Sequence, residues 1–396
     1  MANIFDGVLV IDFSNNLAAP TAVSMLADYG AEVIKIEKAS GDDNRQYGPF
    51  IEGKSLIAMW LNRNKKSIVM DTRKPEAIEI IKKFIAQADV VVESFKPGAI
   101  NKMGFGYEEL IKIKPDLIMC SVSGFGQDGP YGQRPGYDMI AVAMSGLMDN
   151  TGFPDGPPTK IGSAVGDFVG GLDAFGAMAA ALYHKAKTGE GQYIDISLLE
   201  GLVNINDYTD LAYNNFPVPH RGGNHQAVVA PFGLFNGRDG SIIICVASDK
   251  LWAALCTMMG REEMIDDSLY RGSGKRAERK ELIIPMIEDW LKSFESVEEP
   301  LKLMTEKEIP CCKVEKTQDL VRNEQLIARN MIVDMETKEI TAGKIKTRAP
   351  VFHFSKTPGK VRFSPALGEH TDEILKKYAG CGDAEIASLK EKGIVR

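Results

Sequence analysis

Asp167 is the carboxylate whose surroundings in the sequence best suit chemistry. It lies in the segment Lys160–Gly171, between Gly166 and the pair Gly170–Gly171, at the start of an apolar helical stretch. A carboxylate acts as a nucleophile when it is partly desolvated and when small neighbours let an acyl carbonyl approach. The same position also suits a helix N-cap, where the carboxylate only accepts a backbone hydrogen bond. The sequence leaves both interpretations of Asp167 open.

Two glycine-rich segments are candidates for ligand contact. The first, Ser121–Asp138, follows an expected strand, and ligands of open α/β sheets bind at loops after parallel strands. The second, His220–His225, contains Gly222 and Gly223, which suit a mobile lid. Ordinary surface loops have a similar composition. The two histidines have no partner at metal-ligand spacing, so we expect no metal site.

The turn Ser14–Pro20 lies where a dinucleotide-binding fold carries Gly-x-Gly-x-x-Gly. That fingerprint is absent, which argues against a nicotinamide or flavin dehydrogenase. A helix that begins behind a parallel strand still offers free backbone N–H groups to a phosphate. Lys38, after the second expected strand, could face such a phosphate. A plain connecting turn and a solvated lysine are the alternatives.

The elements that would position these residues alternate between strands and helices. Strands are expected over residues 8–11, 33–36, 67–70, 89–93, 117–123 and 193–198, and helices over residues 21–29, 75–86, 107–113 and 167–187. This alternation predicts an α/β fold with a mostly parallel sheet and helices on both faces. A Gly/Pro-rich connection begins after residue 215 and predicts a domain boundary. Residues 220–325 are expected to form a smaller α/β domain.

The composition is that of an ordinary folded protein. The 396 residues are 44% hydrophobic and 26% charged, with 47 basic against 54 acidic residues and a net charge of −7. This charge argues against a non-specific nucleic-acid binder, and an anionic ligand would need a local basic cluster. No run of 18 apolar residues predicts a membrane span. We expect a cytoplasmic protein without a signal peptide, whose six cysteines are reduced structural thiols.

Several of these segments together resemble the class III coenzyme A transferases, also called the CaiB/BaiF or formyl-CoA transferase family. The motifs occur in the family's order over essentially the whole chain. They are Asp6–Val8, Asp12–Phe13, Gly30–Glu37, Asn64–Ser67, Glu93–Gly98, Ser121–Asp138, Gly166–Asp167, Lys187–Gln192 and Pro365–Thr371.

This resemblance implies a two-domain enzyme. A Rossmann-like large domain would be built from residues 1–215 and 330–396, with the small domain 220–325 inserted between them and two protomers interlocked like linked rings. The implied activity moves CoA from an acyl-CoA donor to a carboxylic acid acceptor. CoA and acyl-CoA would be substrates rather than permanently bound cofactors. No metal, nucleic acid or membrane partner is expected.

The family's aspartate nucleophile falls on Asp167, which would attack the thioester and form an acyl-aspartyl anhydride. Gly222 and Gly223 would cover the site and exclude water, and Tyr137 and Asp138 would support it. The implied CoA-binding residues are Asn15, Asn16, Ala18, Lys38, Met70, Arg73, Ser94, Phe95 and Lys102.

Some residues depart from the family's patterns. Tyr137 stands where the racemase branch of the superfamily has a catalytic histidine, which disfavours a 2-methylacyl-CoA racemase. Leu17 replaces the glutamine of the formyl/oxalate branch and favours a less polar acyl group. Ser94 replaces the usual asparagine and leaves one CoA contact open. Tyr47 and the segment 208–216 would line the acyl pocket or belong to the core. A non-catalytic CoA-binding protein is a further alternative.

Overall fold

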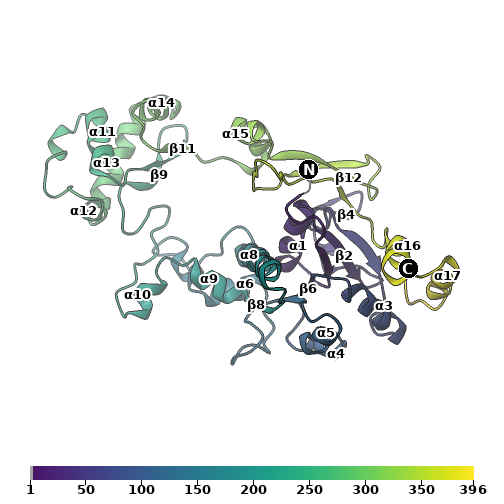
Figure 1. Cartoon of the computed structure of the whole chain (residues 1–396). Helices are drawn as coiled ribbons and strands as arrows, with labels where there is room; N and C mark the ends of the chain where they lie inside the picture. Colours follow the sequence, from purple (N-terminus) through teal and green to yellow (C-terminus); the bar gives the residue numbers. More distant parts are fainter. Residues whose placement is uncertain (1–2) are drawn as a thin grey trace. The chain divides into compact units, whose positions relative to one another are not determined.

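The computed structural model describes residues 3–396, which form two compact units. The first comprises the chain up to Ser145 together with Gly162–Ile205 and Val321–Arg396, and the second comprises Gly146–Ile161 and Asn206–Leu320. Both ends of the chain therefore build the first unit (Figure 1). The expected large domain 1–215 differs at two places, because Gly146–Ile161 and residues 206–215 group with the second unit. The Arg221 guanidinium binds carbonyl oxygens of Gly146–Ile161, a long-range contact that no local pattern predicts.

The first unit is built on a six-stranded parallel sheet in the order β5-β2-β1-β6-β7-β8. The strands are β1 (Leu9–Asp12), β2 (Glu32–Glu37), β5 (Lys66–Val69), β6 (Val90–Glu93), β7 (Ile118–Ser123) and β8 (Tyr193–Ser197). Ranked along the chain, the order of these strands is that of the Rossmann fold, and it reverses between β1 and β6. The expected α/β fold with a Rossmann-like parallel sheet is confirmed.

Helices cover both faces of this sheet, and short strands extend the unit. The helices are α1 (Ala18–Asp28), α2 (Leu56–Leu61), α3 (Pro75–Ile85), α4 (Ala99–Lys102), α5 (Tyr107–Ile113), α6 (Asp138–Met144), α8 (Val165–Thr188), α9 (Leu198–Asn204), α15 (Glu324–Ala328), α16 (Thr371–Ile374) and α17 (Asp383–Glu391). The additional strands are β3 (Phe50–Ile51), β4 (Lys54–Ser55), β12 (Ile332–Thr337), β13 (Lys344–Arg348) and β14 (Phe363–Ser364). The carboxyl-terminal helices lie beside α3 (Figure 1), and Ile374, Leu375 and Phe84 share one buried cluster.

Helix α8 packs closely against α1 because small residues face the contact. A Cβ atom on Gly171 would lie 2.8 Å from the carbonyl oxygen of Ala18, so a larger residue would force the helices apart. Within the described residues α8 is also the helix that is long and apolar enough to cross a membrane, by length and composition only. A helix that packs against a neighbour inside a folded unit, as α8 does against α1, meets the same criterion.

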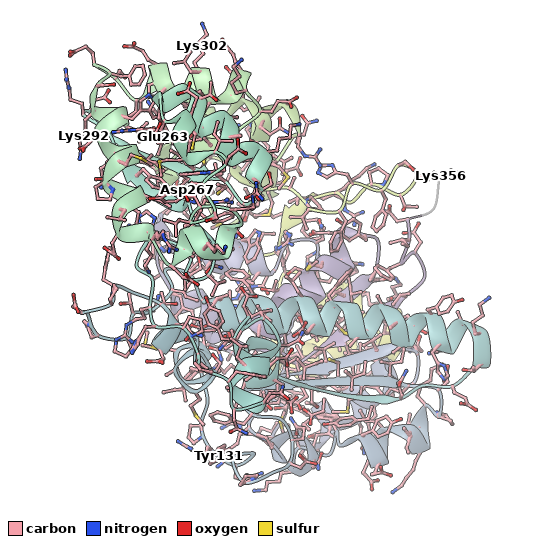
Figure 2. The ribbon with its side chains drawn as sticks, turned by 90° about the vertical axis from the view of Figure 1, so that its left-hand side faces the viewer. Tyr131, Glu263, Asp267, Lys292, Lys302 and Lys356 are labelled. Carbon is pink, nitrogen blue, oxygen red and sulfur yellow. The ribbon has the colours of Figure 1, made fainter. Side chains whose placement is uncertain are left out.

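The second unit has its own core. Its antiparallel sheet has the order β11-β10-β9. Its elements are β9 (Phe232–Asn236), β10 (Ser241–Cys245), β11 (Cys311–Lys313), α7 (Leu147–Asn150), α10 (Thr209–Tyr213), α11 (Asp249–Met259), α12 (Ser273–Ala277), α13 (Lys280–Lys292) and α14 (Glu298–Glu306). Ile242, Trp252 and Ile287 meet in its buried cluster. Lys292 and Lys302 project outward from α13 and α14 (Figure 2).

Candidate functional site

A cavity of about 260 Å³ in the first unit is lined by the turn after β1, the loop after β6 and the loop after β7. These loops leave the carboxyl ends of strands on either side of the point where the strand order reverses. Ligands of open α/β sheets bind at this topological switch point. The cavity brings together residues that the sequence analysis singled out separately. They are Asn15, Asn16, Ala18, Ser94, Phe95, Tyr137 and Asp167.

The Asp167 carboxylate is available for chemistry. Asp167 is the third residue of α8, and no hydrogen-bond donor among residues 3–396 reaches its side chain. Burial, together with the charge of the neighbouring Asp138, raises the pKa of Asp167 to about 7. The amino terminus of α8 acts in the opposite direction, because its dipole favours an anion. A carboxyl group with a pKa of about 7 is half ionised near neutral pH. A reaction at the Asp167 carboxylate would break no hydrogen bond to residues 3–396.

Asp138, and not Asp167, caps helix α8. The backbone N–H groups of Gly166 and Asp167 donate to Oδ1 of Asp138 at 2.7 and 3.2 Å, and the residue at the N-cap position, Ala164, has no side-chain cap. The interpretation of Asp167 as an N-cap is therefore wrong. The cap comes from the start of α6, 28 residues earlier in the chain, so no local pattern revealed it. Asp138 thus orients the first turn of α8 and places a negative charge near Asp167.

Two cations line the cavity without an acidic partner. Neither Lys96 nor Arg134 forms an ion pair with any other residue in the described range 3–396. The Arg134 guanidinium instead lies 4.8 Å from the centre of the Tyr131 ring, on the loop that Figure 2 marks with the Tyr131 label. Because Asp167 is the one acidic residue among those that line this cavity, the cations favour an anionic ligand. Both residues lie in motifs of the family resemblance, Glu93–Gly98 and Ser121–Asp138, but no local pattern marks them as ligand contacts.

Four of the residues implied by the family resemblance do not line the cavity. Lys38 pairs with Asp43 at 2.7 Å, Arg73 pairs with Asp71 at 2.8 Å, and Lys102 lies on the exposed side of α4. Their contact with CoA stays a prediction. Met70 is 1% exposed and its side chain belongs to the core, and its contact with CoA also stays a prediction.

Ser94, which stands where the family usually has asparagine, binds the backbone of the turn after β1. Its hydroxyl accepts the Asn15 N–H at 2.8 Å and donates to the Asn15 carbonyl oxygen at 3.1 Å. Ser94 therefore fixes the backbone of the first turn. The N–H groups of Asn15 and Asn16 are both occupied, because that of Asn16 donates to Asp42. The binding of a phosphate by the free N–H groups at the amino terminus of α1, which begins at Ala18, stays a prediction. Further along the cavity wall, the Ser123 hydroxyl has no hydrogen-bond partner in the part of the chain that the structure describes.

The loop after β7 needs glycine at both of its ends. A Cβ atom on Gly124 would lie 2.9 Å from the Cα atom of Gly136, so the two ends of the loop approach each other as only glycines allow. This contact closes the loop and holds Tyr137 at the cavity. Tyr47 borders the same region, because its hydroxyl donates to Oδ1 of Asn16 at 2.7 Å and its side chain is exposed rather than part of the core.

Gly222 and Gly223 lie in the second unit. A Cβ atom on Gly222 would lie 2.2 Å from the carbonyl oxygen of His225, and Gly223 has a φ of +64°. Both line a cavity of about 420 Å³ that belongs to this unit. The segment 208–216 is also part of the second unit and is largely exposed, so it is not core. The roles of these residues as a lid and as an acyl pocket stay predictions.

The geometry defines an α/β protein with a Rossmann-type sheet, an unbonded carboxylate and two unpaired cations at the switch point. Comparison with known proteins specifies this class further. The family model for CoA-transferase family III matches residues 5–371. Succinyl-CoA:glutarate CoA-transferase from Homo sapiens is 36% identical over 98% of this chain and 89% of its own length. Acetyl-CoA:oxalate CoA-transferase from Acetobacter aceti is 37% identical over 83% of this chain and 85% of its own length.

A crystal structure of a similar protein has the same fold. A CaiB/BaiF family protein from Brucella suis superposes with a TM-score of 0.82 and 33% identity, covering 96% of this chain and 100% of that protein. The chain belongs to CoA-transferase family III. It is an enzyme of the class III CoA-transferases, and CoA thioesters are the substrates of that family.

Proposed function

We propose that this enzyme moves CoA from an acyl-CoA donor to a free carboxylic acid through covalent intermediates on Asp167. The observation that carries the proposal is the Asp167 carboxylate itself, which lines the switch-point cavity and receives no hydrogen bond from residues 3–396. The lining of the same cavity also includes the unpaired cations Lys96 and Arg134. A carboxylate held in this way is free to attack an electrophilic carbonyl.

The covalent transfer needs no reactant besides Asp167, the acyl-CoA donor and the acceptor acid. An oxygen of Asp167 bonds to the thioester carbonyl carbon, the carbon–sulfur bond breaks, and CoA leaves as a thiolate. The product on the enzyme is an acyl-aspartyl anhydride. The thiolate then attacks the aspartyl carbonyl carbon, the bond from that carbon to the bridging oxygen breaks, and the donor leaves as a free acid while CoA is held on Asp167 as a thioester. The acceptor carboxylate displaces the thiolate from this carbon and forms a second anhydride. The thiolate finally attacks the acceptor's carbonyl carbon, whose bond to the bridging oxygen breaks, so that CoA is joined to the acceptor and Asp167 returns as a carboxylate. One thioester is consumed and one is formed.

The cavity residues support this chemistry by binding and orientation. Lys96 and Arg134 can neutralise the phosphate groups of CoA through charge-assisted hydrogen bonds. Asp138 holds the first turn of α8 and keeps Asp167 in place. Leu17 adjoins the same turn as the N-cap residue of α1, and an apolar side chain there favours a weakly polar acyl group.

Trapping of the intermediate tests the proposal. The purified enzyme is incubated with a panel of acyl-CoA esters and treated with hydroxylamine or borohydride, and its peptides are examined by mass spectrometry. We expect a label on the peptide that contains Asp167. Transfer activity without a label on that peptide would contradict the covalent route. Exchange of the α-proton of the acyl group without transfer would favour the racemase.

Removal of the unpaired cations should weaken CoA binding. We expect Lys96→Ala and Arg134→Ala each to raise the KM for acyl-CoA by about tenfold or more, because a charge-assisted hydrogen bond contributes about 1.5 to 3 kcal/mol. The kcat should change much less. Lys302→Ala is the matched control, since Lys302 is an exposed lysine of the second unit. An unchanged KM in both cavity variants would remove these residues from the CoA site.

We further propose that the enzyme is a homodimer with interlocked protomers. Apolar side chains are exposed along α6 and α8, with Tyr137 69%, Leu172 49% and Tyr183 67% exposed. Large exposed apolar side chains mark protein interfaces where they gather into a patch. Light scattering after gel filtration should give about twice the chain mass of 43.4 kDa. A mass of one chain at micromolar concentration would contradict the dimer.

A further inference from the structure

The backbone of the turn Ser14–Asn16, which lines the candidate site through Asn15 and Asn16, is held entirely by side chains. Both backbone groups of Asn15 bond to the Ser94 hydroxyl. The Ser14 N–H donates to Oδ1 of Asp12 at 2.8 Å, and the Ser14 carbonyl oxygen accepts from Nζ of Lys35 at 2.6 Å. Among residues 3–396 no backbone group forms a hydrogen bond with this turn, so its shape depends on these side chains.

The two backbone groups of Asn16 are bound in the same way. Its N–H donates to Oδ1 of Asp42 at 3.1 Å, and its carbonyl oxygen accepts from Nδ2 of Asn44 at 3.2 Å. Asn16 has a φ of 67°, a left-handed conformation that is unfavourable for residues other than glycine. Residues in such conformations persist where the surroundings determine them strongly. Here the surrounding bonds come from Asp42 and Asn44.

Four fully buried charges lie behind the turn. Asp12, Lys35, Asp42 and Lys65 are each at most 1% exposed. Lys35 lies 2.9 Å from Asp42, and Lys65 lies 2.9 Å from Asp12 and donates to the Pro20 carbonyl oxygen at 3.2 Å. We call these four side chains the charge cluster. Its two acids and two bases balance, so it adds no net charge to the cavity.

Burial of four charges contributes little to the stability of a fold, because each charge loses its hydration. The desolvation penalty of a buried ion pair often equals or exceeds its coulombic gain, and a well-packed apolar replacement is often at least as stable. Buried pairs are in some proteins retained because they specify one geometry. In this chain three members of the charge cluster, Asp12, Lys35 and Asp42, each form a hydrogen bond with the backbone of Ser14 or Asn16.

We propose that Lys35 and Asp42 are positioning residues that hold the turn Ser14–Asn16 in the shape required to bind CoA. The inference rests on the proposed function, because it takes the cavity beside this turn as the CoA site. Lys35 and Asp42 do not line the cavity and act through the backbone of Ser14 and Asn16. Their loss should therefore impair CoA binding more than the chemistry at Asp167.

The chain provides a matched control elsewhere in the same unit. Asp28 and Arg63 form an equally buried ion pair at 2.7 Å. Asp28 bonds to Arg63 and to Asn64, and within residues 3–396 neither Asp28 nor Arg63 forms a hydrogen bond or ion pair with the turn Ser14–Asn16. Asp28→Asn therefore removes a buried charge without removing a bond to that turn.

The experiment compares Asp42→Asn and Lys35→Met with Asp28→Asn in the full-length enzyme. Hydrogen–deuterium exchange of peptides that cover residues 13–18 reports on the turn without ligand, calorimetric titration with CoA gives Kd, and steady-state kinetics give KM and kcat. Asp42→Asn keeps the shape of the side chain, and its amide oxygen can still accept the Asn16 N–H, but it removes the charge that pairs with Lys35. Its effect on the turn therefore runs through Lys35 and the Ser14 carbonyl oxygen, and it remains informative if Lys35→Met does not fold. We expect Asp42→Asn to speed exchange at the turn, to raise Kd and KM about tenfold and to change kcat less than threefold.

Asp28→Asn should lower the melting temperature but leave exchange at the turn and the Kd for CoA unchanged. Equal effects of Asp28→Asn and Asp42→Asn on Kd would overturn the inference, because both would then reflect general destabilisation. An unchanged Kd in Asp42→Asn would overturn it as well. Failure of the wild-type enzyme to bind CoA would overturn the proposed function instead, and exchange at the turn would still report whether Asp42 holds it.

Discussion

Asp167→Asn is expected to reduce CoA transfer by at least about 10⁴-fold, because the amide cannot serve as the nucleophile on which a covalent route depends. The Kd for CoA should stay within about threefold of the wild-type value, since the substitution conserves size and Asp167 accepts no hydrogen bond from residues 3–396. Transfer assays, with titration of CoA, measure both quantities.

Asp173→Asn is the matched control for this variant. Asp173 lies on the same helix, its pKa is also raised by burial, and it does not line the cavity. We expect Asp173→Asn to retain transfer activity. An Asp167→Asn enzyme with more than about a tenth of wild-type activity would show that the aspartate is not the nucleophile.

The same Asp167→Asn variant should be more stable than the wild type at pH 8. The pKa of Asp167 is raised to about 7 in the folded protein but is about 3.9 in an unfolded chain. The native state therefore binds the additional proton, so this group's contribution to stability is full below pH 4 and is lost as the pH rises to about 7. Melting curves should show the difference between the two proteins at pH 8 and not at pH 4.

The second large effect is expected in the pH dependence of the reaction. The nucleophile is the carboxylate form, so kcat/KM should fall as the pH falls through about 7, where Asp167 becomes protonated. Below the pKa the rate should drop about tenfold per pH unit. A profile measured from pH 8 to pH 5 should thus span about two orders of magnitude. A rate that is constant down to pH 5 would contradict the raised pKa.

Two variants assign this acid limb to Asp167. Asp138→Asn removes the neighbouring charge that helps to raise the pKa of Asp167, while its amide oxygen can still accept the N–H groups of Gly166 and Asp167. The limb should therefore move to lower pH. Burial also raises the pKa of Glu93 to about 7, so Glu93→Gln is the control and should leave the limb in place. Movement of the limb in Glu93→Gln and not in Asp138→Asn would assign the titration to Glu93.

The sequence by itself determined the order of the elements and the class of the protein. The alternation of buried strand-like runs with helical runs is a local property, so the strands β1, β2, β5, β6, β7 and β8 lie close to the expected ranges. The glycines around Asp167 and at the ends of the loop after β7 mark close approaches of the backbone. The motifs also indicated the family that the comparisons confirm.

Only the tertiary structure shows which residues from distant segments of the chain bind one another. The capping of α8 by Asp138, the bonds from Lys35 and Asp42 to the turn after β1, and the membership of Gly146–Ile161 in the second unit all join segments distant in sequence. Local propensity carries no information about such pairings. The pKa of Asp167 likewise depends on burial and on a neighbour from another helix, because desolvation and charge act through space and not along the chain.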